Sequence, residues 1–323
     1  MIANERPLLE LEGVKKSYPI KRKSLTFKKD YIHAVNGITL DIMARETLGV
    51  VGESGCGKST LGRTILQLET LNEGSVKFKS QDVSKVSKAK KMQLKRDMQM
   101  IFQDPYASLD PRQKVGRALE EPLLIHTKKT KSERQTKVNQ LLKEVDLTEE
   151  HAERYPHQFS GGQRQRIGIA RALALDPQFI VCDEAVSALD VSVQAQVIQL
   201  FQSLQENHDL TYLFISHDLS VIRYISDRIL VMYLGNMAEL APANVLYNYP
   251  KHPYTKTLLS AIPSFTVNER KERLKLKDTD EKNGPVTGCP FEPRCPMAKD
   301  HCKTLIPEWR EINPGHFVAC HEV

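Results

Sequence analysis

One run of residues, Gly-Glu-Ser-Gly-Cys-Gly-Lys-Ser-Thr at positions 52–60, constrains the fold of this chain more than any other feature. It matches the pattern Gly-x4-Gly-Lys-Ser/Thr, follows the apolar run Leu48–Val51 and precedes the helix-like segment Leu61–Leu68. The glycines allow successive backbone N–H groups to converge on phosphate oxygens, and the helix presents its positive N-terminal end to the same anion. In this pattern Lys58 reaches the β- and γ-phosphates and Ser59 ligates Mg²⁺. The sequence therefore predicts a strand–loop–helix unit that binds a nucleoside triphosphate.

A second apolar run ends in two adjacent carboxylates. Phe179–Cys182 is followed directly by Asp183 and Glu184. Asp183 is placed to hold Mg²⁺ through water, as the second metal anchor of P-loop NTPases does. Because side chains alternate along a strand, Glu184 is expected to point the other way and to polarise the attacking water. The two runs together predict hydrolysis as well as binding.

Apolar segments of strand length alternate with segments of helical periodicity along most of the chain. The predicted strands are Leu8–Val14, Ile32–Ile42, Glu46–Val51, Met98–Phe102, Phe179–Cys182, Thr211–Ile215 and Arg228–Tyr233. The predicted helices are Leu61–Leu68, Gln163–Leu175, Val191–Asn207, Leu219–Ile225 and Lys256–Ala261. Strands that alternate with helices around a phosphate-binding loop predict a parallel, helix-covered α/β core. Residues 111–174 have a helical pattern and predict a helical insertion into that core.

Composition and the terminal sequence limit the class of protein. A chain of 323 residues with 40% hydrophobic and 27% charged residues has the composition of an ordinary globular protein. Apolar runs such as Phe179–Cys182 and Ile229–Leu234 are far shorter than the roughly 18 residues of a membrane helix. The first residues have neither a basic region nor an apolar region typical of a signal peptide. We therefore expect a cytoplasmic chain whose cysteines are reduced.

The positive charge is concentrated in one segment. The net charge is +6, and Lys15–Asp30 alone holds seven Lys or Arg against one Asp, which is also +6. Such a stripe suits nucleic acid, anionic lipid or simple solvation, and a solvated face is the commonest of the three. We therefore predict no nucleic-acid partner.

Six short motifs occur in a fixed order. They are the run at 52–60, Gln103 in Phe-Gln-Asp-Pro, Ser-Gly-Gly-Gln at 160–163, the strand ending in Asp183-Glu184, Ser-Ala-Leu-Asp at 187–190 and Ser-His-Asp at 216–218. Over residues 8–240 this set resembles the nucleotide-binding domain of an ABC ATPase. The resemblance implies ATP and Mg²⁺, and an α/β fold with a P-loop NTPase (RecA-like) core, an antiparallel β subdomain and an inserted α-helical subdomain at about residues 104–174.

The resemblance also implies roles for individual residues. Glu184, His217 and Gln103 are the expected catalytic residues, and Ser59, Gln103 and Asp183 are the expected Mg²⁺ ligands. His217 would contact the γ-phosphate, and Gln103 would also couple to a membrane partner. The expected contacts to ATP are Tyr18, Gly52, Glu53, Ser54, Gly55, Cys56, Gly57, Lys58, Ser59, Thr60, Ser160, Gly161, Gly162, Gln163 and Asp190. Tyr18 would stack on adenine, although the basic insertion at 19–30 follows it directly.

The motif at 160–163 is expected to serve a second chain. It heads a predicted helix, and a helix N-terminus with small residues is an anion receptor. In the family that the chain resembles, this motif closes over ATP bound to the opposite subunit. An isolated chain is therefore expected to bind ATP and to hydrolyse it poorly.

The C-terminal sequence narrows the resemblance. His-Pro-Tyr-Thr at 252–255 and Cys-Pro-Phe-Glu-Pro-Arg-Cys-Pro at 289–296 resemble the C-terminal extension of the peptide-importer ABC ATPases. The insertion at 19–30 and the run at 101–111 resemble the F-type subunit of that group. The expected division is an ABC domain at 1–243, a connecting segment and linker at 244–288 and a Cys-rich extension at 289–323.

This resemblance implies partners, a location and a cargo. The expected partners are a sister ABC ATPase in a heterodimer, two membrane permease subunits and, indirectly, an extracellular solute-binding protein. The location would be peripheral, on the cytoplasmic face of the cell membrane. Oligopeptides are the expected cargo, with dipeptides, nickel or metallophores as alternatives. A soluble ABC ATPase that acts on nucleic acid or ribosomes is a remoter alternative, because such proteins usually carry two cassettes in one chain.

Four cysteines lie close together near the C-terminus. Cys289, Cys295, Cys302 and Cys320 are separated by 5, 6 and 17 residues. In a cytosolic protein such a group favours a metal site over disulfides. None of the spacings is the C-x2-C of common zinc sites or a ferredoxin pattern. Peptide-importer relatives with these cysteines are associated with a 4Fe-4S cluster, and zinc or unligated thiols are the alternatives.

Overall fold

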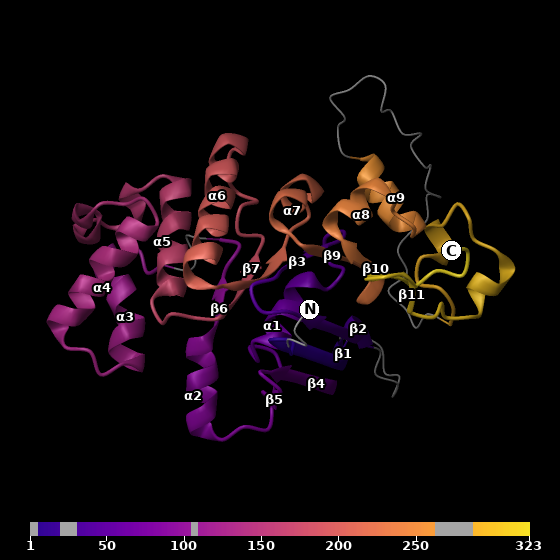
Figure 1. Ribbon diagram of the computed structural model, residues 1–323, viewed down its shortest axis with the longest axis horizontal. Coiled ribbons are helices and arrows are strands. Elements are labelled where there is room, and N and C mark those ends of the chain that lie inside the picture. Colours follow the sequence, from indigo (N-terminus) through magenta and orange to yellow (C-terminus); the bar gives the residue numbers. More distant parts are fainter. Residues whose placement is uncertain (1–5, 20–30, 105–108, 262–286) are drawn as a thin grey trace, which may run out of the picture. The chain divides into compact units, whose positions relative to one another are not determined.

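The computed structural model describes residues 6–19, 31–104, 109–261 and 287–323. These residues belong to two compact units (Figure 1). The first unit is formed by Met1–Leu8, Ile42–Thr47 and Gln81–Ser216, and the second by Leu9–Asp41, Leu48–Ser80 and His217–Val323. Residues 20–30 of the predicted basic insertion and residues 262–286 of the predicted connecting segment and linker lie outside the described residues.

The first unit contains a parallel sheet of the predicted strands. Strand β7 (Phe179–Asp183) pairs in parallel with β6 (Met98–Ile101) on one side and with β8 (Thr211–Ile215) on the other. Every residue of β7 and β8 is buried, as expected for parallel strands that are covered on both faces. Helix α6 (Val191–His208) joins β7 to β8. Its Phe201 packs edge-on against Tyr212 and Phe214 of β8, with ring centroids 5.6 and 5.5 Å apart.

The first unit also contains the predicted helical insertion, which is confirmed (Figure 1). Its elements are α3 (Val115–His126), α4 (Lys131–Glu144), the 3-10 turns η1 (Glu149–Glu153) and η2 (Pro156–Gln158), and α5 (Gly161–Leu173). The short strand β5 (Gln81–Asp82) and helix α2 (Lys88–Asp97) precede β6 in the same unit and lie outside the predicted insertion. Helices α3, α4 and α5 pack against one another. Helix α4 starts with a capping box between Thr130 and Glu133 and buries Val138, Leu141 and Leu142, which lie on one face at helical spacing.

An antiparallel sheet lies in the second unit. Strand β1 (Leu9–Pro19) pairs with β4 (Glu73–Phe78), and β2 (Tyr31–Ile42) lies on the other side of β1. Strand β1 was predicted to end at Val14, but it continues to Pro19. Its polar half is held by long-range contacts, since Lys15 pairs with Glu73 at 2.7 Å and the buried Lys16 donates to the Thr70 carbonyl at 2.9 Å.

A mixed group of strands carries the phosphate-binding loop in the second unit. Strand β3 (Thr47–Val51) is parallel to β9 (Arg228–Tyr233), and β9 is antiparallel to β10 (Asn236–Pro242). Strand β10 then pairs with β12 (His316–Val318), and β12 pairs with β11 (Arg310–Asn313). Strands β4, β10, β11 and β12 were not predicted: β11 and β12 are four and three residues long, β4 alternates between apolar and polar residues only in its last half, and β10 lacks the alternation that marks a strand.

The remaining helices of the second unit surround these strands. They are α1 (Lys58–Ile65), α7 (Leu219–Ile225), α8 (Ala243–Asn248), α9 (Pro253–Ser260) and the 3-10 turns η4 (Glu292–Arg294) and η5 (Asp300–Lys303). The helix predicted at Lys256–Ala261 begins three residues earlier, at Pro253. Helix α9 begins at Pro253 because proline suits the first helical position and His252 Nδ1 accepts the N–H of Tyr254 at 3.1 Å.

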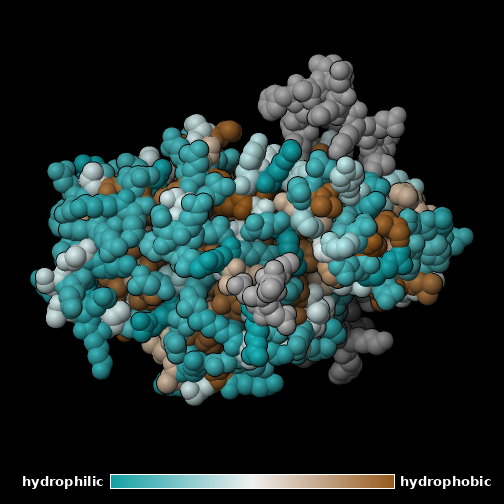
Figure 2. Space-filling model, in the orientation of Figure 1, coloured by the Kyte–Doolittle hydropathy of each residue, from teal (hydrophilic) through white to brown (hydrophobic). Residues whose placement is uncertain are grey.

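Among the described residues, no helix is both long and apolar enough to cross a bilayer. The face drawn in Figure 2 is mainly hydrophilic, and its hydrophobic residues form small scattered patches.

Candidate functional site

The loop between β3 and α1 has the backbone geometry of an anion receptor. Helix α1 begins at Lys58, three residues earlier than predicted, directly after Gly57. Gly57 is in the left-handed region with φ of 105°, and a Cβ atom there would lie 1.8 Å from the carbonyl oxygen of Ala34. At Gly52 a Cβ would lie 2.2 Å from the carbonyl oxygen of Met232. Only glycine fits both positions, so the loop packs tightly while its N–H groups remain at the helix N-terminus.

The lysine of this loop is folded back over it. Lys58 is 4% exposed, and its Nζ donates to the carbonyls of Gly52 at 2.8 Å and Glu53 at 2.9 Å. Its Nζ also lies 3.8 Å from the sulfur of Cys56. Burial raises the pKa of the Cys56 thiol, so this residue is a packing group at neutral pH. Ser59 and Thr60 lie in the first turn of α1.

Two residues from the C-terminal part of the chain contact the same loop, and sequence reasoning missed both. Arg294 holds the Glu53 carboxylate with two parallel bonds, from Nη1 to Oε2 at 2.7 Å and from Nη2 to Oε1 at 2.9 Å. The hydroxyl of Tyr254 accepts the backbone N–H of Glu53 at 2.8 Å. No local pattern could have revealed these contacts, since Arg294 and Glu53 are 241 positions apart.

The carboxylates after β7 lie beside Gln103. Asp183 is the last residue of β7 and is 3% exposed. Glu184 lies beyond the strand in the left-handed region, with φ of 49°. Its direction is therefore set by a tight turn, rather than by the strand alternation that we expected. Gln103 Nε2 donates to Glu184 Oε2 at 2.7 Å, so the structure brings together two of the three predicted catalytic residues.

The Ser-Gly-Gly-Gln motif forms the N-terminus of α5. The helix begins at Gly161, two residues earlier than predicted, and Ser160 is its N-cap. Ser160 Oγ accepts the N–H of Gln163 at 3.3 Å, and Gln163 Oε1 accepts the N–H of Ser160 at 3.1 Å. This is a reciprocal capping box. At Gly162 a Cβ would lie 2.5 Å from Cγ1 of Val193, so glycine lets α5 approach α6 closely.

Three further predicted residues lie at the ends of elements. Asp190 is the exposed N-cap residue of α6, and His217 is exposed two residues after the end of β8. Tyr18 lies near the end of β1, with Lys16 Nζ 5.0 Å from its ring centroid. Gln103, Ser160, Asp183, Glu184 and Asp190 belong to the first unit, whereas Tyr18, the phosphate-binding loop and His217 belong to the second.

A groove opens beside the Gln103 segment in the first unit. It is lined by residues of β6, α3 and α5, among them Phe102, Ile125 and Arg171. Phe102 and Ile125 are hydrophobic yet 46% and 61% exposed. Arg171 pairs with Glu121 at 3.3 Å at its edge. This surface was not predicted.

The four C-terminal cysteines share one small pocket. Cys295, Cys302 and Cys320 are buried, Cys289 is partly buried, and the N–H of Cys289 donates to the carbonyl of Cys302 at 2.8 Å. Burial raises the pKa of the Cys289 thiol to about 11 and also raises that of Cys320. Without a bound cation, the thiols of Cys289 and Cys320 would therefore stay protonated at neutral pH.

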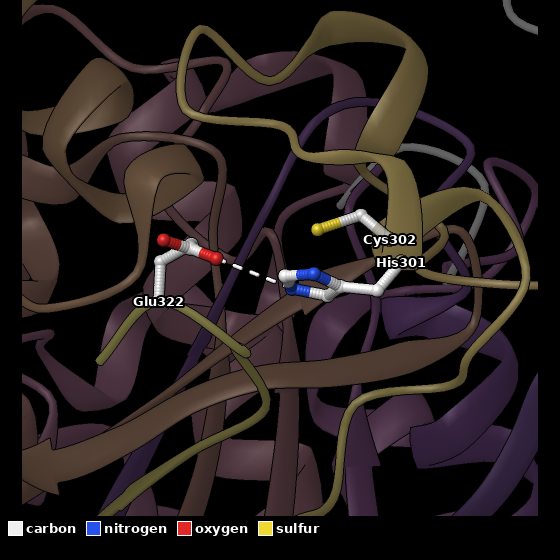
Figure 3. Close-up of side chains that lie close together, drawn as sticks. All are labelled: His301, Cys302 and Glu322. Atoms are coloured by element: carbon white, nitrogen blue, oxygen red, sulfur yellow. Dashed lines mark ion pairs between the residues drawn. The ribbon is translucent and has the colours of Figure 1, made fainter.

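A different group of side chains has its ligand atoms close enough together to bind one metal ion. Within the described ranges, one group has all its ligand atoms within 4.8 Å of one another: His301, Cys302 and Glu322 (Figure 3). His301 Nε2 lies 3.2 Å from Glu322 Oε1, and the thiol of Cys302 lies beside them. However, Lys299 Nζ already pairs with the other Glu322 oxygen at 2.5 Å. This group is therefore satisfied as an ion-pair cluster.

Comparison with known families accounts for most of the chain. The profile of the ABC transporter family matches residues 35–187, and that of the oligopeptide/dipeptide transporter C-terminal region matches residues 238–302. A dimeric ATP-binding cassette, MJ0796 in a post-hydrolysis state with ADP and Pi, has a TM-score of 0.64 and 29% identity, and covers 73% of this chain and 98% of its own. The predicted cassette fold is thereby confirmed.

Whole-length relatives narrow the family. The oligopeptide transport ATP-binding protein AppF of Bacillus subtilis is 52% identical over 323 residues, covering 99% of this chain and 98% of that protein. The di/tripeptide transport ATP-binding protein DppF of Pseudomonas aeruginosa is 50% identical over 291 residues, covering 90% of each chain. The chain therefore belongs to the ABC transporter family, among the ATP-binding subunits of oligopeptide and dipeptide importers.

Proposed function

We propose that this chain binds and hydrolyses ATP in order to drive the import of peptides through an ABC transporter. The observation that carries the proposal is a preformed phosphate-binding loop, closed by Lys58, in a chain that matches peptide-transport ATP-binding proteins over nearly its whole length. The relatives named for oligopeptides and for di- and tripeptides have similar identities, 52% and 50%. The proposed cargo is therefore peptides as a class.

The phosphate-binding loop is proposed to hold the triphosphate. Gly52 to Thr60 would supply backbone N–H groups, and Lys58 would exchange its bonds to loop carbonyls for bonds to the β- and γ-phosphates. Tyr18 is proposed to stack on adenine. Hydroxyl, amide and carboxylate oxygens suit a hard cation, so Ser59, Gln103 and Asp183 fit Mg²⁺, which neutralises charge on the phosphate oxygens.

Glu184 is proposed to be the general base. It would take a proton from the attacking water, whose oxygen bonds to the γ-phosphorus while the bond to the β–γ bridging oxygen breaks, giving ADP and inorganic phosphate. Gln103 supports this role, because its amide holds one Glu184 oxygen at 2.7 Å and so limits the positions of the carboxylate. His217 is proposed to contact the γ-phosphate.

A second ATPase chain is proposed to complete the site. Ser160, Gly161, Gly162 and Gln163 would contact ATP bound to the partner, and Asp190 would lie at the interface. The dimeric solved cassette supports such an arrangement. We propose a heterodimer with a sister ATPase, as the resemblance to the F-type subunit suggests.

The groove beside Gln103 is proposed to receive a cytoplasmic segment of a membrane permease. Its exposed Phe102 and Ile125 offer an apolar surface, and Phe102 is bonded directly to Gln103 in the chain. Movement of a docked segment would thus reach a catalytic residue. The chain would then lie peripherally on the cytoplasmic face of the membrane, with two permeases as direct partners and a solute-binding protein as an indirect one.

The four C-terminal cysteines are proposed to hold a 4Fe-4S cluster. They fit a cluster because all four line one pocket. They fit a single zinc ion less well: four tetrahedral bonds of about 2.3 Å need sulfurs about 3.8 Å apart. Among the described residues, no three of these sulfurs form a group within 4.8 Å. Anaerobic purification followed by iron and sulfide analysis tests the proposal, and a colourless protein with stoichiometric zinc would reject it.

The proposed function is tested by transport. The tagged chain is purified with its associated subunits from detergent-treated membranes and reconstituted into liposomes with a labelled oligopeptide. We expect uptake to require ATP and to fail with Glu184→Gln, whereas Glu153→Gln, an exposed carboxylate paired with Lys114 at 2.8 Å, leaves uptake unchanged. Uptake that is independent of ATP, or unaffected by Glu184→Gln, would contradict the proposal.

A further inference from the structure

The backbone and the side chain of Glu53 in the phosphate-binding loop are both held by residues from the C-terminal part of the chain. The Glu53 carbonyl accepts a hydrogen bond from Lys58 Nζ, and its backbone N–H donates to the Tyr254 hydroxyl. Its carboxylate accepts two bonds from Arg294. The Glu53 and Arg294 side chains are 35% and 15% exposed, so the pair is partly shielded from water. A bidentate guanidinium–carboxylate pair fixes orientation as well as charge.

The two C-terminal contacts come from a rigid setting. Tyr254 is fully buried, and its ring packs against Tyr233 and Phe291 with centroids 4.8 and 5.4 Å apart. The Arg294 guanidinium lies 5.8 Å from the centroid of the Tyr233 ring. An aromatic cluster therefore supports both side chains that reach the loop.

A buried carboxylate fixes the start of α9, which carries Tyr254. Glu239 of β10 is fully buried, and its oxygens accept the N–H groups of Lys251 at 2.8 Å and His252 at 2.9 Å. The same carboxylate lies 2.7 Å from Nε2 of His316 in β12. Strand β10, helix α9 and strand β12 are thus joined at one point, and α9 cannot shift without breaking these bonds.

We propose that Arg294 and Tyr254 are positioning residues for the phosphate-binding loop, so that the C-terminal segment sets the affinity of the chain for nucleotide. This inference rests on the proposed binding of ATP. Arg294 compensates the negative charge of Glu53 in a loop that must receive an anionic phosphate chain. Tyr254 fixes the backbone at the same residue.

The Glu53 charge distinguishes this role from simple packing. Loss of Arg294 leaves the Glu53 carboxylate less compensated beside the phosphates, so nucleotide binding should weaken. Loss of both charges should restore it, because no carboxylate then repels the phosphates. If Arg294 only held the loop in shape, the double variant would bind nucleotide as weakly as Arg294→Gln, because both variants lack every bond of the Arg294–Glu53 pair.

The experiment measures the Kd of the full chain for MgADP, which is not hydrolysed, by titration calorimetry. Arg294→Gln is expected to raise Kd about 10-fold, the effect of one charge-assisted contact. Arg294→Lys keeps the positive charge but cannot form two parallel bonds to the carboxylate, so an intermediate Kd is expected. The double variant Glu53→Gln/Arg294→Gln should return to within about threefold of the wild-type Kd. Tyr254→Phe, which keeps the ring, should raise Kd by about threefold.

Lys299→Gln is the matched control, because Lys299 is also a cation of the C-terminal segment but pairs with Glu322. Its Kd should equal that of the wild type. A wild-type Kd for Arg294→Gln, or a double variant as weak as Arg294→Gln, would overturn the inference. Failure of the wild-type chain itself to bind MgADP would instead refute the proposed function.

Discussion

The N-termini of helices α1 and α5 both carry small residues and both belong to motifs for phosphate, but they differ in how their first N–H groups are satisfied. Helix α1 follows Gly57, and among the described residues no side chain caps it. Helix α5 follows Ser160, which forms a capping box with Gln163. A helix leaves its first four N–H groups without intrahelical partners. A side chain of the same segment satisfies one of these groups in α5 but none in the described part of α1.

The difference indicates when each end can bind phosphate. At α1 the loop is already curled, and binding of the proposed nucleotide would require Lys58 only to release the carbonyls of Gly52 and Glu53. At α5 the capping box satisfies the N–H groups of Ser160 and Gln163, so the proposed contact with a partner's ATP would compete with these bonds. Such a box contributes about 1 kcal/mol, which is small enough to be exchanged during assembly.

The largest expected effect is on ATP hydrolysis, and it should leave ATP binding at the loop before α1 unchanged. Glu184→Gln in the assembled complex should reduce ATP turnover by about 10²- to 10⁴-fold, because the general base is lost. Binding of ATP should remain, since Glu184 does not belong to the loop before α1. Steady-state turnover and nucleotide titration on the same preparation check both statements. Turnover at the wild-type rate would remove Glu184 from the proposed mechanism.

Gly57→Ala should disrupt the phosphate-binding loop at the N-terminus of α1. The new Cβ would lie 1.8 Å from a backbone oxygen, in a conformation with φ of 105°. We expect ATP affinity to fall by about 10- to 100-fold, as strain of about 1–3 kcal/mol at this residue would cause. Gly168→Ala in α5 is the control, because its Cβ would meet nothing within 4 Å in the described part of the chain. Equal ATP affinities in the two variants would show that the loop geometry is not required.

Ser160→Ala should affect nucleotide chemistry only in the assembled complex. The variant loses an N-cap, which should lower the free energy of unfolding by about 1 kcal/mol. Its ATP affinity as an isolated chain should equal that of the wild type, whereas turnover in the complex should fall by about tenfold if Ser160 contacts the partner's ATP.

Thr130→Ala is the matched control for Ser160→Ala, because Thr130 and Glu133 form the same capping box on α4. Thermal unfolding should show similar losses in both variants, but only Ser160→Ala should lower turnover. If both variants lower turnover equally, the effect of Ser160 is one of helix stability alone.

The sequence revealed what depends on local pattern. Strands β8 and β9 and helix α7 have the bounds predicted from their apolar periodicity, and the phosphate-binding loop was identified from its glycines and Lys58. The start of α1 was misplaced because the loop residues are polar, although Lys58 is already helical. The start of α9 was misplaced because its cap, His252, is not a common N-cap residue.

The contacts that link distant segments could not be predicted. Arg294 reaches Glu53 across 241 positions, and Glu239 meets His316 across 77. Each of these residues is charged or titratable and looks like an ordinary surface residue in the sequence. The contact of Glu239 with His316 depends on the pairing of β10 with β12, and β12 is only three residues long. Such a strand carries too little sequence signal for prediction.

The smallest expected effect concerns the thiol in the loop before α1. Burial raises the pKa of Cys56, so less thiolate is present at any given pH. Alkylation of Cys56 at pH 7 should therefore be at least about tenfold slower than that of free cysteine, and it should speed up as pH rises. Peptide mass spectrometry after timed alkylation measures this rate. Rapid modification at pH 7 would contradict the burial of Cys56 in the loop before α1.

The most direct test compares binding and hydrolysis by the purified chain at dilutions where it is monomeric. We predict one ATP bound per chain with a Kd that does not depend on protein concentration, and a turnover per chain that rises when the partner ATPase is added. Full turnover per chain in the monomer would contradict the account, because the N-terminus of α5 would then have no part in hydrolysis.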